Sequence, residues 1–446
     1  MSGWMRAIGA AVAFLILGLA QAHAAERTVV VVLFDGFPPR LIDPHNTPNL
    51  SGLKQEGSWS DDLVPAFPTI SLINHTTFET GCWPVHHGVV SNEFYDPKLG
   101  KFGEKMISSD ADWHTGCEAM WQAAERQGVK SAALNFVGRW SGTKGKLATY
   151  ANPLVPWKDA LSDDAILATA LKLLKDNGPD HPRLLALYFR GPDEAEHFKG
   201  SLSPETKAAA HKADVIVGKL IAALSALPKD REGTLVIGTD HGMTDVGPLI
   251  NATRLMNKLE IKGKVAADGA SAFIYLDKDE SADRVMTALA DYKDLFSAYR
   301  KGHYPSYSHL PVGGRSGDIL LVTKPPYWMA DDSVFPGWAQ WLGINWIWPV
   351  SFTPVSGGIK ATHGFDPALK SMHGIFYAWG AGITKGHKVD HLDMIDVHPT
   401  VMSLLGLQPG KPLDGKVVTE ILTGCRRAPL PANSTLLGSQ IKCDPQ

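Results

Sequence analysis

Several apolar runs in the chain end abruptly in acidic or histidine residues, and this pattern constrains the fold more than any other feature. Residues 28–34 (TVVVVLF) stop at Asp35, residues 183–189 (RLLALYF) stop shortly before Asp193, and residues 233–238 (GTLVIG) stop shortly before Asp240. The runs do not alternate between apolar and polar residues, which is typical of parallel strands that are buried on both faces of a sheet.

Segments with helical periodicity alternate with these strands, and two further apolar runs are expected to be strands. The helices are expected at residues 163–175, 205–227, 281–292 and 398–405, and the two strands at residues 318–322 and 374–378. Such alternation predicts a doubly wound α/β sheet with helices on both faces. Ligands bind such sheets outside the carboxyl ends of the strands, which is where the acidic and histidine residues of this chain collect.

The N-terminus has the pattern of a secretory signal peptide. Arg6 is followed by an apolar run over residues 10–20 and then by Ala22-His23-Ala24, with small residues where a signal peptidase cuts. The apolar run is shorter than the roughly 20 residues that span a membrane. We therefore expect cleavage after Ala24, with an uncleaved anchor as the alternative. The mature protein is expected to be periplasmic or secreted, without a transmembrane segment.

The rest of the chain is long enough for one large α/β domain over residues 25–424, followed by a tail over residues 425–446. The formal net charge is only −3, so no basic surface points to a nucleic-acid duplex as partner. Residues 325–354 contain five tryptophans among several Pro and Gly residues. They are expected to form an inserted loop or lid near the site, with an aromatic packing loop as the alternative.

The four cysteines, Cys82, Cys117, Cys425 and Cys443, allow three disulfide pairings, and the sequence does not choose among them. Export makes disulfides plausible. A bridge between Cys425 and Cys443 would tie down the Pro/Ser-rich tail and would leave Cys82 to pair with Cys117.

Six residues that follow strands or lie in glycine-bounded loops are candidate metal ligands. They are Asp35, Asp193, His197, Asp240, His241 and His363. Each one alone is more often a helix cap or a structural polar residue. Together, three carboxylates and three imidazoles suit zinc and are enough for two sites of three ligands each. Two metal ions about 4 Å apart can stabilise the attacking and leaving oxygens of an in-line displacement.

Thr69 and Asn92 are the candidate catalytic residues beside the metal ligands. The run after Pro68 could start a helix with Thr69 at its N-terminal end, where free N–H groups suit an anion. A metal-bound Thr69 hydroxyl could attack phosphorus; the alternative is that Thr69 only caps the helix. Asn92 follows a turn and could donate a hydrogen bond to a phosphoryl oxygen, although Asn is also common in turns.

Seven segments together resemble the nucleotide pyrophosphatase/phosphodiesterase family, within the alkaline phosphatase superfamily. They occur in the family's order and span nearly the whole mature chain. They are LFDG at 33–36, FPT at 67–69, HGVVSNEFYDP at 87–97, GPDEAEH at 191–197, GTDHGM at 238–243, GDILLV at 317–322 and HGFDPALKSMHGIF at 363–376.

The resemblance implies an alkaline-phosphatase-like α/β/α sandwich on a mostly parallel central sheet, with two zinc ions. It implies that Asp193, His197 and His363 bind one zinc, and that Asp35, Asp240 and His241 bind the second together with Thr69. It further implies that Thr69 displaces the leaving alcohol or nucleotide group, so that a covalent phosphothreonine forms and is then hydrolysed. Asn92 is implied to stabilise the phosphoryl oxygens.

The residues after Thr69 depart from the family pattern. Residues 70–75 (ISLINH) lack the common Lys-Thr-Phe-Pro-Asn form, so the leaving group, nucleotide or lipid-like, stays open. The Trp-rich segment could form an apolar pocket for a lipid-like leaving group.

Three other functions compete with a phosphodiesterase. A phosphomonoesterase needs an extra cation, and no Lys or Arg lies beside Asn92 in the sequence, although Arg139 or Arg190 could reach the site. A sulfatase needs a Cys/Ser-x-Pro-x-Arg motif, and residues 82–86 (CWPVH) lack the Arg. A binding protein that has lost catalysis is disfavoured because every expected ligand is present. The sequence therefore favours a phosphodiester substrate.

Overall fold

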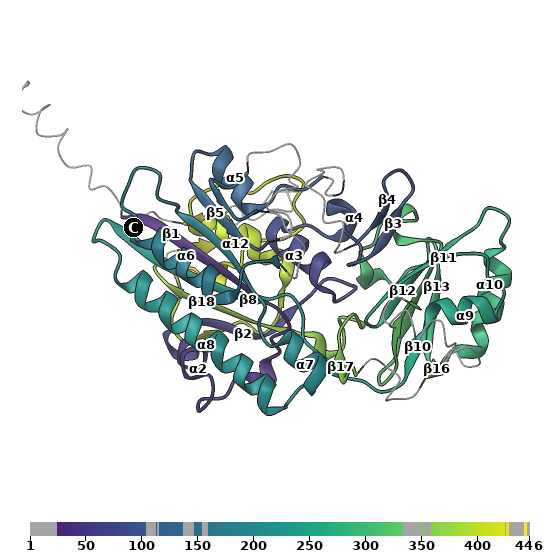
Figure 1. Cartoon of the computed structure of the whole chain (residues 1–446). Coiled ribbons are helices and arrows are strands. Elements are labelled where there is room, and N and C mark those ends of the chain that lie inside the picture. Colours follow the sequence, from purple (N-terminus) through teal and green to yellow (C-terminus); the bar gives the residue numbers. More distant parts are fainter. Residues whose placement is uncertain are drawn as a thin grey trace, which may run out of the picture.

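A computed structural model of the chain describes residues 25–103, 113, 116–136, 147–153, 159–332, 350–351, 358–423, 425–427 and 441–443. The expected signal peptide, residues 1–24, lies outside them. The described residues form a larger lobe around a nine-stranded sheet and a smaller lobe around a four-stranded sheet, side by side in Figure 1. No helix among the described residues is both long enough and apolar enough to cross a membrane.

The central sheet has the strand order β19-β2-β18-β8-β1-β7-β5-β6, and β20 also pairs with β2. Strand β1 lies between β7 and β8 and is parallel to both, whereas β18 runs antiparallel to β8 and β2. The strands are β1 (Glu26–Phe34), β2 (Gly57–Val64), β5 (Ser131–Leu134), β6 (Tyr150–Ala151), β7 (Leu184–Phe189), β8 (Arg231–Thr239), β18 (Gly374–Gly380), β19 (His387–Lys388) and β20 (Leu392–Asp393). The expected mostly parallel central sheet is confirmed.

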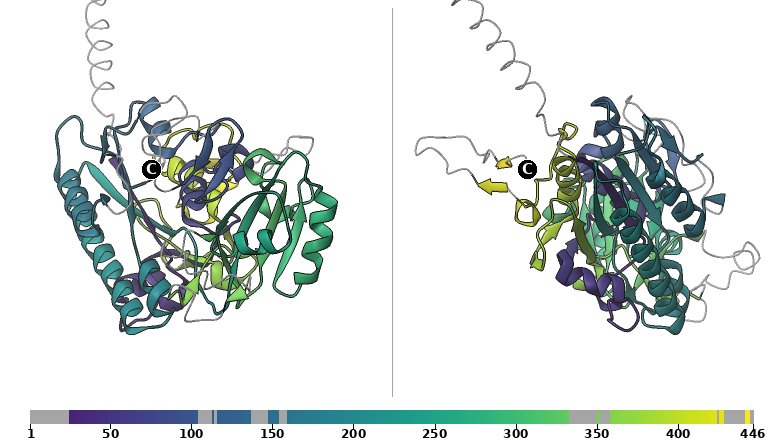
Figure 2. Two further views of the ribbon diagram at one scale, coloured as in Figure 1. Left: turned by 45° about the vertical axis from the view of Figure 1, so that its right-hand side comes forward. Right: turned by 90° about the vertical axis from the view of Figure 1, so that its left-hand side faces the viewer.

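Helices cover both faces of this sheet because β1 is apolar on both sides. Val29, Val31 and Leu33 belong to one core cluster, and the alternate residues Val30 and Val32 belong to the other. The first face packs against α3 (Ser71–Thr80), α5 (Met120–Arg126) and α12 (Val397–Leu404), and the second against α2 (Pro48–Glu56), α6 (Asp163–Lys175) and α8 (Pro204–Ser225). The two helical layers lie on opposite sides of the sheet in Figure 2, so the three-layer architecture is confirmed.

The helices expected from periodicity are present. The segment at 163–175 is α6, and the segment at 205–227 is α8; both begin after a serine whose side chain accepts a hydrogen bond from the first turn. The segment at 281–292 forms α10 (Ala282–Leu289) and a 3-10 turn, and 398–405 forms α12.

The smaller lobe is a fully antiparallel sheet of order β11-β12-β14-β13, covered on its outer face by α9 (Ala252–Lys258) and α10. Its strands are β11 (Gly263–Asp268), β12 (Ser271–Leu276), β13 (Phe296–Arg300) and β14 (Ile319–Thr323). The strand expected at 318–322 is therefore present as β14, but its assignment to the parallel sheet is wrong.

The physical reason is that β14 is buried on both faces although its sheet is antiparallel. Ile319 and Leu321 pack beneath α9 and α10. Leu320 and Val322 pack against the larger lobe, in a cluster that includes Phe67. A continuous apolar run indicates that a strand is buried on both faces. In β14, α9 and α10 cover one face and the larger lobe covers the other.

The remaining strands and helices are short. They are α4 (Pro84–His87), α7 (Asp193–Lys199), β3 (Phe94–Asp96), β4 (Gly100–Phe102), β9 (Thr244–Asp245), β10 (Leu249–Asn251), β15 (Trp328–Ala330), β16 (Val350–Ser351), β17 (Ala361–Thr362), β21 (Cys425–Arg427) and β22 (Ile441–Cys443). The 3-10 turns are Pro39–Leu41, Ala290–Tyr292, Ser306–Ser308, Gly314–Ser316, Lys370–Met372, Met394–Asp396 and Thr419–Ile421.

The Trp-rich segment falls mostly outside the described residues. At its start, Trp328 is buried in β15, which pairs in parallel with β10; near its end, β16 pairs with the other side of β10. Residues 333–349 and 352–354, which carry the other four tryptophans, are not among the described residues.

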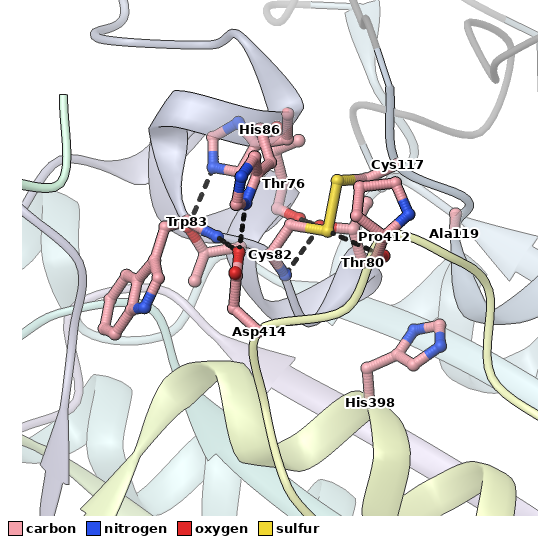
Figure 3. Close-up of a disulfide and its surroundings, with 12 residues drawn as sticks. Thr76, Thr80, Cys82, Trp83, His86, Cys117, Ala119, His398, Pro412 and Asp414 are labelled. Atoms are coloured by element: carbon pink, nitrogen blue, oxygen red, sulfur yellow. Dashed lines mark hydrogen bonds and ion pairs between the residues drawn. A yellow bond between two sulfur atoms is a disulfide. The ribbon is translucent and has the colours of Figure 1, made fainter. Parts of the chain in front are cut away.

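A disulfide joins Cys82 to Cys117, with their Cα atoms 6.6 Å apart. It connects the chain just after α3 with the segment before α5, and Cys82 Sγ lies 3.3 Å from the Pro412 carbonyl oxygen (Figure 3). In the tail, β21 and β22 pair so that Cys425 stands opposite Cys443 in the backbone register. The expected pairing of Cys82 with Cys117 is confirmed.

Candidate active site

Three parallel strands carry the three candidate aspartates to one edge of the sheet. Asp35 follows β1, Asp193 begins α7 shortly after β7, and Asp240 follows β8. Because β1 pairs with both β7 and β8, the three carboxyl ends lie next to one another.

Two glycines allow the loops after β1 and β7 to meet at this edge. A Cβ on Gly191 would lie 2.2 Å from the carbonyl oxygen of Asp35, and one on Gly36 would lie 2.9 Å from the Cβ of Asp193. Both glycines also have φ near +55°, a left-handed conformation that side chains disfavour.

The three candidate histidines reach the same edge by different routes. His197 lies one turn after Asp193 on α7, with its Nε2 3.4 Å from Asp193 Oδ1. His241 directly follows Asp240. His363 follows β17, which pairs with β9 just after His241, and the His363 and His241 rings stack 3.7 Å apart. The pairing of β17 with β9 thus returns a distant part of the chain to the site.

Five of the six side chains form two overlapping groups that could each hold a metal ion. Asp193, His197 and His363 present ligand atoms within 4.8 Å of one another, and so do Asp35, Asp193 and His241. The first group is the set expected from the sequence. The second group contains Asp193 where the sequence predicted Asp240. Asp240 is nevertheless close, because its Oδ2 lies 3.5 Å from His241 Nε2. Asp193 is therefore a member of both groups.

The carboxylates at this site are crowded and buried. Burial raises the pKa of Asp35 well above its ordinary value, and the negative charges of Asp240 and Asp193 raise it further. One buried oxygen of each aspartate accepts no hydrogen bond from the described residues: Asp35 Oδ1, Asp193 Oδ1 and Asp240 Oδ2. Each of these oxygens faces a histidine nitrogen at 3.4 to 3.6 Å without a hydrogen bond. Because buried carboxylates are costly when they are not fully satisfied, this cluster is a candidate cation site.

The three imidazoles are oriented for metal binding. In each ring Nδ1 lies within hydrogen-bond distance of a backbone carbonyl: Ala361 for His197 at 2.8 Å, Gly242 for His241 at 3.0 Å, and Thr69 for His363 at 3.0 Å. When Nδ1 donates in this way, Nε2 is left as the ligand atom that faces the aspartates. Burial, together with the charge of His241, holds the pKa of His363 well below its ordinary value, so this ring is neutral. Burial lowers the pKa of His197 too, but the charge of Asp193 outweighs it and raises that pKa to about 9.

Two buried residues that the sequence did not single out contact the aspartates. The Tyr188 hydroxyl donates a hydrogen bond to Asp35 Oδ2, and His75 Nε2 lies 3.6 Å from Asp240 Oδ2. The two rings are 4.2 Å apart. Tyr188 lies beside Leu33 in the register of β7 with β1, which places it near Asp35; this register is a tertiary property that no local pattern reveals.

The helix near Thr69 begins two residues later than expected. Ile70 has an extended backbone, and α3 starts at Ser71. Thr69 Oγ1 accepts a hydrogen bond from the amide of Gly364 at 3.0 Å and donates one to the Phe365 carbonyl at 3.1 Å. Ser71 Oγ instead lies 3.2 Å from His241 Nε2. Of these two hydroxyls, Ser71 is the one in contact with a candidate metal ligand.

Asn92 lies beside this helix start. Its Oδ1 accepts a hydrogen bond from the Leu72 amide at 2.9 Å, which orients the amide group next to Ser71. Among the described residues, no hydrogen bond uses its Nδ2, and no Lys or Arg side chain hydrogen-bonds to Ser71 or Asn92. Arg139 lies outside the described residues. The Ser71 hydroxyl and the Asn92 Nδ2 amide thus lie close together at the start of α3.

A model of the family described as type I phosphodiesterase / nucleotide pyrophosphatase matches residues 29–366. An uncharacterized pyrophosphatase/phosphodiesterase of Schizosaccharomyces pombe is 27% identical over 414 residues, which cover 87% of this chain and 79% of that protein. Ectonucleotide pyrophosphatase/phosphodiesterase family member 7 of Homo sapiens is 26% identical over 410 residues, 90% of this chain and 84% of that protein. Venom phosphodiesterase 2 of Crotalus adamanteus is 26% identical over 408 residues, 88% of this chain but only 47% of that protein, so the chain spans about half the length of this venom enzyme.

Solved structures agree with the fold. Murine ectonucleotide pyrophosphatase / phosphodiesterase 5, as an inactive variant in complex with AMP, superimposes with a TM-score of 0.75 at 25% identity, covering 89% of this chain and all of that one. The human protein of the same name has the same TM-score and coverage at 23% identity.

Proposed function

Because the chain belongs to the type I phosphodiesterase / nucleotide pyrophosphatase family, we propose that it is a two-zinc hydrolase of phosphodiesters that forms a covalent phosphoryl-enzyme intermediate. The observation that carries the proposal is the gathering of three aspartates with unpartnered oxygens and three oriented imidazoles beside a hydroxyl at the start of a helix.

The proposed ligands of one zinc are Asp193, His197 and His363, and those of the second are Asp35, Asp240 and His241. A mixed set of carboxylate oxygens and neutral imidazole nitrogens suits zinc. Two such ions polarise the phosphoryl group and stabilise the attacking and leaving oxygens. Tyr188 and His75 support Asp35 and Asp240 from the protein interior.

For the nucleophile, the sequence points to Thr69, whereas the contacts favour Ser71. Support for Ser71 comes from its 3.2 Å contact with His241 and from its place as the first residue of α3, where free amides attract a phosphate. The Thr69 hydroxyl is occupied by two backbone groups. In the proposed first step, a bond forms between Ser71 Oγ and phosphorus as the bond to the leaving oxygen breaks, and that oxygen departs as an alcohol with the proton lost by Ser71. The other ester group stays on the phosphoryl group, so the intermediate is a phosphodiester of Ser71. Water then cleaves the bond between Ser71 Oγ and phosphorus, which restores the serine and releases a phosphomonoester.

Paired variants distinguish the two hydroxyls. Ser71→Ala is expected to lower kcat by roughly 10³-fold or more, because it removes the attacking atom. Thr69→Val keeps the shape of Thr69 and is expected to keep kcat within about tenfold, with a loss of stability of about 1 kcal/mol for the lost hydrogen bonds. Acid-trapped enzyme, mapped by mass spectrometry, should carry on Ser71 the phosphoryl group with the ester group that the substrate retains. The same adduct on Thr69, with an active Ser71→Ala enzyme, would instead assign the nucleophile to Thr69.

Asn92 is proposed to donate from Nδ2 to a non-bridging phosphoryl oxygen. The hydrogen bond from Leu72 to its Oδ1 supports this role, because it leaves the donor side of the amide for the substrate. Asn92→Ala is expected to lower kcat about 10²- to 10³-fold, the usual effect of removing one such donor.

We propose a diester substrate, with a nucleotide as the favoured group and a lipid-like group as the alternative. The murine relative solved with AMP and the family description support a nucleotide. A phosphomonoesterase is the competing function. It is disfavoured because a dianionic monoester needs further positive charge, and among the described residues no Lys or Arg side chain hydrogen-bonds to Ser71 or Asn92.

The purified zinc enzyme can be tested on bis-p-nitrophenyl phosphate and p-nitrophenyl phosphate. We expect a higher kcat/KM on the diester, and faster turnover of the monoester would refute the proposal. Nucleoside 5′-phosphodiesters, glycerophosphodiesters and lysophospholipids in the same assay identify the leaving group.

We further propose that residues 1–24 are a signal peptide, that residues 25–424 form the catalytic unit and that residues 425–446 are a tail. The disulfide between Cys82 and Cys117 supports a periplasmic or secreted location, because such bonds persist in oxidising compartments.

A further inference from the structure

Asn92 lies in a loop of irregular structure. This loop runs over residues 88–93, between α4 and β3. Its first half is anchored, because Val89 and Val90 are fully buried and the Val89 amide donates a hydrogen bond to His87 Nδ1. Asn92 itself is half-buried, and the hydrogen bond from Leu72 holds only the tip of its side chain. Contacts that fix the backbone on both sides of Asn92 therefore help to keep its amide in one place.

Arg315, from the smaller lobe, contacts both ends of this loop. Its Nη1 donates to the Gly88 carbonyl at 2.8 Å, and its Nε donates to Asp96 Oδ2 at 2.7 Å. Gly88 and Asp96 flank Asn92 on either side, four residues away in each direction. Nη1 also donates to the carbonyl of Trp113 at 2.6 Å. One planar guanidinium therefore connects three separate points of the larger lobe.

The environment of Arg315 keeps it in this position. Its side chain is only 11% exposed, and that of Asp96 only 12%. The guanidinium lies 5.5 Å from the ring centroids of both Phe94 and Trp113. Burial alone would raise the pKa of Asp96, yet the hydrogen bond from Arg315 helps to lower it, so the pair is charged on both sides.

A second contact ties the backbone of Arg315 to the strand that follows the loop. The Tyr275 hydroxyl, on β12, donates to the carbonyl of Arg315 at 2.5 Å and accepts a hydrogen bond from the amide of Tyr95 at 3.2 Å. The hairpin β3–β4 consequently lies against the smaller lobe, as Figure 1 shows.

We propose that Arg315 is a positioning residue for Asn92: it joins the smaller lobe to both ends of the loop and holds the Asn92 amide at the phosphoryl oxygen. Arg315 itself does not contact the substrate. This inference rests on the proposed role of Asn92, and it gives the smaller lobe a part in catalysis.

The test is a double-mutant cycle between Arg315→Lys and Asn92→Ala in the full mature enzyme. Lys keeps the charge but cannot make all three contacts. We expect Arg315→Lys to lower kcat by about 10- to 100-fold through misplacement of the amide, with KM within about twofold. In the Asn92→Ala background the same change should lower kcat by less than about twofold, because the group it positions is gone.

Arg254→Lys is the matched control. Arg254 also forms an ion pair with an aspartate, because its Nε lies 3.2 Å from the carboxylate of the partly buried Asp332. Among the described residues, it forms no hydrogen bond with the Asn92 loop. It should leave kcat within about twofold. Tyr275→Phe, which removes one hydroxyl and no charge, provides a milder variant with the same expected dependence on Asn92.

Bound zinc and the thermal midpoint are measured for every variant. Equal losses from Arg315→Lys in both backgrounds, or an equal loss from Arg254→Lys, would overturn the inference while leaving the role of Asn92 intact. If Asn92→Ala alone left kcat unchanged, the proposed role of Asn92 would fail, and the inference would fail with it.

Discussion

At the scale of single residues, Asp193 has the most central position in the site. Its Oδ1 lies 3.4 Å from His197 Nε2 and 3.8 Å from His363 Nε2, and Asp193 also belongs to the second group with Asp35 and His241. We therefore expect Asp193, proposed as a ligand of the first zinc, also to supply negative charge next to the second zinc, beside the proposed second-site ligands Asp35, Asp240 and His241.

Asp193→Asn is therefore expected to remove most of both zinc ions, whereas His197→Gln, its matched control, should remove only one. The amide loses the charge that offsets each cation, while His197 contacts the first group alone. Metal content after dialysis, measured by inductively coupled plasma mass spectrometry, gives the answer. Retention of one tightly bound zinc by Asp193→Asn would contradict the shared position.

The sequence identified candidate metal ligands that the structure brings together, but it could not decide between the two candidate nucleophiles. Asp35, Asp193 and Asp240 follow recognisable strands, and the position of a strand end is a local property. Thr69 and Ser71 are two residues apart and chemically alike. They differ because the amide of Gly364 hydrogen-bonds to the Thr69 hydroxyl, whereas the Ser71 hydroxyl faces His241. Gly364 is far from Thr69 in the sequence, so no local pattern predicts this contact.

At the scale of elements, the packing of α3 against α12 supports the end of α3 opposite to the site. The two helices were expected, but their contact was not. His398 of α12 is fully buried, its Nδ1 lies 2.7 Å from the Glu79 carbonyl at the end of α3, and burial lowers its pKa to about 4.

This histidine makes stability depend on pH. Its ordinary pKa is 6.5 and its pKa in the folded protein is about 4, so between these values the unfolded chain binds the proton more tightly. The contribution is fully present above pH 6.5, is lost as the pH falls from 6.5 to 4, and totals on the order of 3 kcal/mol.

His398→Asn keeps a donor for the Glu79 carbonyl but cannot take up a proton. Urea unfolding of both proteins at a series of pH values should show a flatter profile for the variant between pH 6.5 and pH 4. Parallel profiles for the two proteins would show that His398 does not titrate in this range.

At the scale of the whole molecule, the disulfide supports the proposed export of the protein. The bond between Cys82 and Cys117 closes a loop with a sequence separation of 35 residues. Such a loop contributes about 4 kcal/mol in the chain-entropy account. A protein that depends on this bond should be less stable when it is made in a reducing compartment.

Expression with residues 1–24 into a bacterial periplasm, and without them into a reducing cytoplasm, tests both expectations. The exported protein should begin at residue 25 by mass spectrometry and contain the bond between Cys82 and Cys117. The cytoplasmic protein should unfold at lower denaturant concentration. An exported Cys82→Ser, Cys117→Ser variant is the control and should match the cytoplasmic protein. An exported protein that keeps its first 24 residues would indicate an uncleaved anchor instead.

The sequence by itself determined most strands and helices and pointed to the candidate metal ligands, because burial on both faces, helical periodicity and residues at strand ends are local features of the sequence. The tertiary structure alone decided how these parts meet. It assigned β14 to a second sheet, returned His363 to His241 through β17, favoured Ser71 over Thr69, and brought Arg315 to the loop of Asn92. Each of these four features depends on contacts between residues that are far apart in the sequence. A local sequence pattern can indicate that a residue is buried, but it cannot indicate which part of the chain covers that residue.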